Sequence, residues 1–107
     1  MIYEYRMYEA VQGKLPKVVD MMERTVPIFK RLGVKVVGFW TPVIGEYSDR
    51  FIYILGFESL EHRQQSWAKF AADPDWQKAS AEFKKDGPVT VRSMNTILKP
   101  TSYSPVQ

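Results

Sequence analysis

The sequence predicts an α+β fold of the ferredoxin-like type, in which one antiparallel sheet carries helices on a single face. Two observations lead to this fold class. Apolar residues alternate along some segments and recur every three to four positions along others, in the order βαββα(α)β. The run from Phe51 to Phe57 is apolar on both faces, which is typical of a strand covered on both sides.

The N-terminal third of the chain predicts a strand followed by a helix. Residues 1–9 alternate and are rich in tyrosine, so we expect a first strand there. From Lys14 to Leu32 apolar residues recur at threes and fours, as in an amphipathic helix, and Gly33 marks its end. Because Pro27 lies inside this helix and lacks a backbone donor, we expect a kink or a break.

The remainder predicts three strands and a divided helical segment. We expect strands at Val34–Val43, Phe51–Phe57 and Val89–Leu98, each rich in β-branched or aromatic residues. Ser59 is a favourable N-cap for the helix that follows the third strand. The stretch Asp73-Pro74 favours the end of that helix and the start of another, since Asp caps a helix and Pro suits its first position.

Composition indicates one globular domain. The chain has 107 residues, of which 45% are hydrophobic and 25% charged, and we expect a domain over residues 1–99 with a tail over residues 100–107. There is no cysteine, so neither disulfides nor thiolate chemistry are available, and we expect a cytoplasmic location. No apolar run approaches the roughly 20 residues that span a bilayer, so membrane insertion is not expected.

The basic character of the chain does not point to nucleic acid. The formal net charge is +3, but acidic residues are interleaved with the basic ones, as on an ordinary solvated surface. The third predicted strand, R50-F-I-Y-I-L-G-F57, also departs from the strand motif of RNA-recognition domains, which has Gly at its second position.

The two faces of the third strand predict self-association. Four large apolar residues lie on one face and two isoleucines on the other: Phe51, Tyr53, Leu55 and Phe57 against Ile52 and Ile54. Helices on one side would leave the second apolar face in water. We therefore expect a homodimer in which two sheets pack face to face and form a barrel-like core.

The first strand carries the candidate chemistry. Glu4, Arg6 and Tyr8 share one face, and if the opposite face packs on the helices, these three side chains point into the barrel side. Two interpretations stay open. Glu4 and Arg6 form a structural ion pair, or Arg6 holds an anionic or carbonyl group of a ligand while Glu4 or Tyr8 exchanges a proton with it.

Aromatic residues supply the predicted walls of a ligand pocket. Trp40 is in phase with Gly38, whose missing side chain leaves room, and Tyr53 lies on the third strand, so both are candidate ligand-binding residues beside Arg6. Ordinary core packing is the alternative. His62 is the only histidine, and without a second His or any Cys we expect no metal site and no cofactor.

Several segments, in their order and spacing, resemble a NIPSNAP-type domain. They are E4-Y-R-M-Y8, G13-K-L15, G38-F-W-T-P-V-I-G45, E58-S-L-E-H-R63 and D73-P-D-W76. The resemblance implies a dimeric α+β barrel, a superfamily that includes quinol-type and haem-degrading monooxygenases and lactone isomerases. It implies a protein of uncharacterised function, which we expect to bind a small hydrophobic oxygenated molecule in the barrel. The alternative is a cofactor-independent monooxygenase or isomerase.

Overall fold

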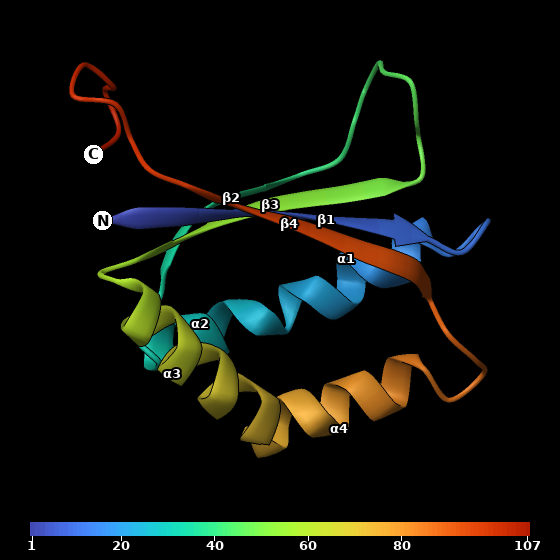
Figure 1. Ribbon diagram of the computed structural model, residues 1–107. Coiled ribbons are helices and arrows are strands. Elements are labelled where there is room, and N and C mark those ends of the chain that lie inside the picture. The colour runs from blue at the N-terminus through green and yellow to red at the C-terminus, as the bar shows by residue number, and fades with distance from the viewer.

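The computed structural model describes residues 1–107 and contains one four-stranded antiparallel sheet. Its strands are β1 (Ile2–Ala10), β2 (Lys35–Trp40), β3 (Arg50–Phe57) and β4 (Thr90–Leu98), in the spatial order β2-β3-β1-β4. The helices are α1 (Leu15–Glu23), α2 (Thr25–Arg31), α3 (Leu60–Ala72) and α4 (Pro74–Phe83), and all lie on one face of the sheet (Figure 1). The predicted α+β fold class is confirmed. None of the helices is long and apolar enough to cross a membrane.

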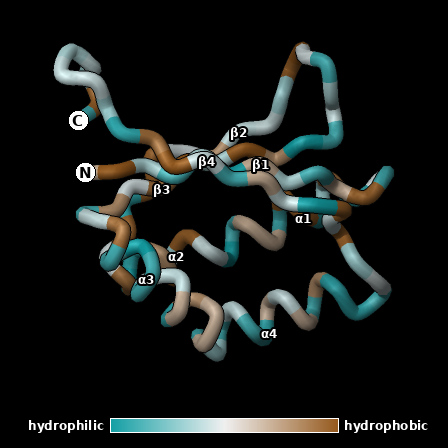
Figure 2. Tube along the Cα trace, in the orientation of Figure 1, coloured by the Kyte–Doolittle hydropathy of each residue, from teal (hydrophilic) through white to brown (hydrophobic).

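The helix-facing row of β3 forms the centre of the core. Phe51, Tyr53, Leu55 and Phe57 are all buried there, against residues of the helices such as Phe29. The exposed large hydrophobic residues lie outside this row. Figure 2 shows hydrophobic chain at the tip of the β2–β3 connection, where Val43 and Ile44 are each 96% exposed. This connection and the C-terminal tail both rise on the side away from the helices (Figure 1).

The predicted break in the first helical segment is present, but it lies at Arg24, three residues before Pro27. Proline has no N–H for the bond that would run to the carbonyl four residues earlier, and that carbonyl belongs to Glu23, the last residue of α1. Thr25 bonds its hydroxyl to the carbonyl of Met22, at 2.6 Å, within the break. Pro27 itself then sits in the first turn of α2, where a missing donor costs little.

The strand register corrects the predicted orientation of the first strand. Arg6 lies directly opposite Tyr53 of β3 and Asn95 of β4, so these side chains share one face, and that face is the one beneath the helices. Glu4, Arg6 and Tyr8 therefore point toward the helix layer and not toward a second sheet. The predicted direction was wrong because it assumed that the opposite face of the strand packs on the helices, whereas α3 supplies bonding partners for Glu4.

A second correction concerns β2. Its pairing with β3 shifts register between Val36 and Gly38, so Phe39 lies opposite Tyr53 while Trp40 lies opposite Ile52. A shift of this kind sends the following side chains to the other face of the sheet. Trp40 therefore lies on the helix-free face, which we call the open face, and does not line a cavity with Arg6.

Candidate functional site

Glu4 is the hub of a polar network between the sheet and α3. Its carboxylate is fully buried and accepts five hydrogen bonds, each between 2.8 and 3.0 Å. Arg63 contributes two of them from α3, and the others come from Trp67, Asn95 and Arg6. A buried carboxylate is tolerated when its oxygens are saturated with donors in this way. The network fixes β1, β4 and α3 to one another.

These bonds also determine the ionisation of Glu4. Burial alone raises the pKa of this carboxyl, but the bonds from Arg63, Asn95, Trp67 and Arg6 outweigh it and lower the pKa to about 2. Glu4 is thus a permanently charged group whose oxygens are all engaged. This geometry favours an orienting role for Glu4 over the alternative role of proton partner.

Arg6 is held in a fixed orientation by one bond on each side. Its Nη1 donates to Glu4 at 3.0 Å and its Nε donates to the hydroxyl of Tyr53 at 2.7 Å. The guanidinium also lies 4.6 Å from the ring centre of Trp67, within cation–π range. No hydrogen bond in the protein engages the second terminal nitrogen, Nη2. Burial alone lowers the pKa of Arg6, but Tyr53, Tyr8 and Glu4 raise it, so the cation is permanent.

Tyr53 and Tyr8 extend this chain of bonds. Their hydroxyl oxygens are 2.7 Å apart. Tyr53 is fully buried, and Tyr8 is the acceptor within its reach, so its O–H must donate to Tyr8 or remain unsatisfied at a cost of about 1–3 kcal/mol. Burial and the neighbouring Tyr8 raise the pKa of Tyr53 well above its usual range, which keeps it protonated. The O–H of Tyr8 is consequently left free to donate elsewhere.

Arg6 and Tyr8, which carry these two unengaged donors, line one pocket. It has a volume of about 310 Å³ and lies on the helix side of the sheet, against β1, β4 and α4. Arg6 and Tyr8 form part of its wall, Met21 and Trp76 give it apolar surface, and no acidic side chain lines it. The full lining is Arg6, Tyr8, Met21, Trp76, Lys84, Thr90, Arg92 and Ser93. We call this the Arg6 pocket.

The structure brings together most, but not all, of the predicted site. Glu4, Arg6, Tyr8 and Tyr53 form one bonded cluster. Trp40 stands on the opposite face, 47% exposed, and its ring covers Gly38 so closely that a Cβ there would lie 2.7 Å from the ring. The space that a glycine leaves at position 38 is therefore filled by Trp40 itself.

Other residues of the site were not found from the sequence. The sequence pointed to neither Arg63 nor Trp67 as a partner of Glu4, since they lie about sixty positions from it and nothing local links them. Their spacing on α3, four residues apart, puts both on one face of the helix and was the available signal. Lys84 and Arg92 looked like ordinary surface cations and reach the pocket only because α4 and β4 meet there.

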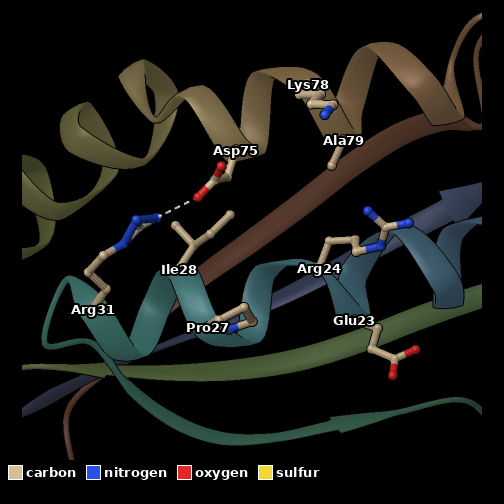
Figure 3. A pocket seen from close by; sticks show the side chains of 8 residues that line it. All are labelled: Glu23, Arg24, Pro27, Ile28, Arg31, Asp75, Lys78 and Ala79. Carbon is tan, nitrogen blue, oxygen red and sulfur yellow. Dashed lines mark ion pairs between the residues drawn. The ribbon is translucent and has the colours of Figure 1, made fainter.

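A larger hollow lies between the helices but is a weaker candidate. It has a volume of about 760 Å³ and separates α2 from α4, as Figure 3 shows. Of its three cations, Arg31 is already paired, at 2.6 Å with Asp73 and at 3.5 Å with Asp75, and the acidic residues Glu23 and Asp75 also line the hollow. Nor do three or more His, Asp or Glu side chains gather anywhere in a way that could hold a metal ion.

Sheet order, helix placement and the buried Glu4–Arg6–Tyr53–Tyr8 cluster define a two-layer α+β protein of the ferredoxin-like class, with a polar pocket between sheet and helices. The family model described as NIPSNAP matches residues 3–105. The chain belongs to the NIPSNAP family, and the predicted family resemblance is confirmed.

Solved structures agree with this assignment. A NIPSNAP family protein from Agrobacterium tumefaciens is 30% identical, with a TM-score of 0.84 over 99% of this chain and 98% of that one. A NIPSNAP domain protein from Burkholderia xenovorans is 22% identical, with a TM-score of 0.82 over 98% and 99%. An antibiotic biosynthesis monooxygenase is 7% identical, with a TM-score of 0.64 over 94% and 99%, and shares the fold. No curated protein matches the chain.

Proposed function

We propose that this protein binds a small, hydrophobic, oxygenated molecule in the Arg6 pocket. One observation carries the proposal: two strong donors, Nη2 of Arg6 and the O–H of Tyr8, have no protein acceptor and border the same pocket. Met21 and Trp76 add apolar surface beside them. A few convergent polar groups in a mostly pre-formed hollow are typical of small-molecule sites.

The supporting network makes these donors rigid before any ligand arrives. Glu4 fixes one edge of the Arg6 guanidinium and Tyr53 fixes another, so the direction of Nη2 is set. Tyr53 likewise sets the direction of the Tyr8 hydroxyl. Preorganised donors lose little entropy on binding, which favours recognition of an oxygen atom at a defined place.

The proposal is tested with a panel of small aromatic ketones, quinones, lactones and carboxylates. A ligand that binds the folded protein raises the melting temperature. We expect at least one class to do so for the natural chain and to lose the effect in Arg6→Met. Arg63→Met is the matched control, because Arg63 also bonds to Glu4 but does not line the pocket. If Arg6→Met keeps the full shift, the site is elsewhere.

A second candidate function is catalysis without a cofactor, as a monooxygenase or an isomerase. It is favoured by the chain of hydrogen bonds from Arg6 through Tyr53 to Tyr8. The Tyr8 hydroxyl at its end is able to donate to a substrate oxygen that gains negative charge during a reaction. Product analysis with each molecule of the panel that binds separates the two functions. An enzyme would lose turnover in Tyr8→Phe while still binding the ligand. Binding with no product in the natural chain supports the first function alone.

We also propose that the chain forms a homodimer through its open face, and that it acts in the cytoplasm. The open face is apolar over much of its area, with Val37, Trp40, Ile52, Ile54, Met94 and Leu98 all at least partly exposed. An apolar face without central charges is complementary to a copy of itself. The absence of cysteine supports the location.

A further inference from the structure

We infer that the Arg6 pocket selects a small carboxylate with an attached apolar segment over a neutral molecule of the same shape. This inference rests on the proposed function and adds the charge of the ligand to it. Three of the eight lining residues are cations, namely Arg6, Lys84 and Arg92, and none is acidic. Such a lining attracts an anion and disfavours a cation.

The cations around the pocket are not fully neutralised by the protein. Arg6 and Arg63 share the single carboxylate of Glu4, which leaves one positive charge in excess. Lys84 takes part in no ion pair of the fold. Of these cations, Arg6 and Lys84 line the pocket. A bound anion would supply the missing negative charge.

The charge of the third lining cation, Arg92, is largely neutralised by neighbouring acidic residues. Arg92 pairs with Glu9 at 3.2 Å, and Glu9 also contacts Arg50, which in turn binds Asp49. This outer cluster holds two positive and two negative groups. Arg92 is also well exposed, so it contributes to the field at the mouth of the pocket and not to a close contact inside it.

The arrangement of donors favours a carboxylate among anions. Arg6 and Tyr8 both line the pocket, and each keeps a donor that no protein acceptor engages, so together they can serve the two oxygens of one carboxylate. Met21 and Trp76 lie beside them and suit a ring or short alkyl group. A volume of about 310 Å³ lies at the small end of the range for ligand pockets and suits a small molecule. Inorganic phosphate would use the charge but leave the apolar wall empty.

Benzoate and benzamide test the inference, since they share size and ring but differ in charge. Titration calorimetry on the full chain should give benzoate a dissociation constant lower than that of benzamide by roughly tenfold or more. The double variant Lys84→Gln, Arg92→Gln should weaken benzoate severalfold and reduce the salt dependence of its binding, while benzamide is unaffected. Lys85→Gln is the matched control, because Lys85 adjoins Lys84 in sequence but does not line the pocket.

The possible outcomes distinguish failure of this inference from failure of the proposed function. Equal affinity for benzoate and benzamide, or no effect of the double variant, would overturn charge selection while the binding function stands. Phosphate binding as tightly as benzoate would overturn the role of the apolar wall. If neither benzoate nor benzamide binds and no panel molecule discriminates Arg6→Met from the natural chain, both the inference and the proposed function fail.

Discussion

The ionisation of Glu4 is coupled to folding, because four side chains hold its charged form only in the native state. The folded pKa of about 2 lies below the ordinary value of 4.5. A lowered pKa contributes stability that is fully present above about pH 4.5 and is lost as the pH falls through 2. The contribution is on the order of 3 kcal/mol.

We therefore expect the free energy of unfolding of the natural chain to fall more steeply with acid than that of Glu4→Gln. Denaturant titrations at several pH values between about 5 and 2 measure both. The variant should be less stable at the upper end, and the two should converge at the lower end. Parallel curves would show that Glu4 is not the charged hub described above.

Tyr53 offers a second test at the residue scale. Tyr53→Phe removes the acceptor of Arg6 Nε and the donor to Tyr8 at once. Leaving a buried guanidinium N–H unpaired should cost about 1–3 kcal/mol, measured by chemical denaturation. Tyr5→Phe is the control, because the Tyr5 hydroxyl makes only a 4.0 Å contact with the sulfur of Met7. Equal effects of the two substitutions would argue against this chain of hydrogen bonds.

Residues on adjacent strands were easier to predict than residues joined by packing. Arg6 and Tyr8 share a strand phase, and Tyr53 meets them because the antiparallel register is fixed by apolar rows. Trp40 was assigned to the wrong face of the sheet, because a bulge in β2 moves the side chains that follow it to the opposite face. No residue pattern in the sequence predicts this bulge. Arg63 and Trp67 reach Glu4 only because α3 packs against β1. This contact depends on the tertiary structure and cannot be predicted from local sequence.

Among the elements, the break between α3 and α4 depends on Asp73. Its side chain accepts from the backbone N–H groups of Asp75 and Trp76, as an N-cap does, and also binds Arg31 of α2 at 2.6 Å. One carboxylate therefore begins a helix and ties it to another. The sequence predicted the cap but not the ion pair, since the ion pair depends on how the helices pack.

Asp73→Ala should lower the free energy of unfolding by about 1–2 kcal/mol, because the cap is lost. Thermal or urea unfolding measures the change. Asp75→Ala is the control: this aspartate is mostly exposed and only 3.5 Å from Arg31, so its removal should cost clearly less. Asp73→Asn should recover most of the loss, since Asn also caps helices. A similar loss for all three would contradict the capping role.

At the scale of the whole molecule, the helices cover one face of the sheet and leave the other apolar face open (Figure 1). We expect light scattering to give the mass of two chains at micromolar concentration. Ile54→Lys places a charge on the central strand β3 within the open face and should yield single chains. Ala81→Lys, on the exposed side of α4, should leave the dimer intact. A natural chain that is monomeric would contradict the proposed assembly.

The fold class could be predicted from the sequence because the spacing of apolar residues, the helix caps and the turn residues all indicate the same order of elements. Ser59 and Asp73 cap the helices as predicted, and Gly33 has the positive φ of 73° that suits a glycine at a helix end. The position of the pocket did not follow, since it depends on which face of β1 the helices cover. The polar side chains of Glu4, Arg6 and Tyr8 were predicted to point away from the helices, but a polar network whose members are all hydrogen-bonded can be buried beneath them.

The three tryptophans provide the most direct test that ligand binds between sheet and helices. Trp76 lines the Arg6 pocket, Trp67 stacks on Arg6, and Trp40 lies on the opposite face. Each has one indole N–H signal in a ¹H–¹⁵N spectrum. During a benzoate titration we predict that the Trp76 signal shifts most, the Trp67 signal less, and the Trp40 signal not at all. Movement of Trp40 alone, or of none of the three at millimolar benzoate, would contradict the account.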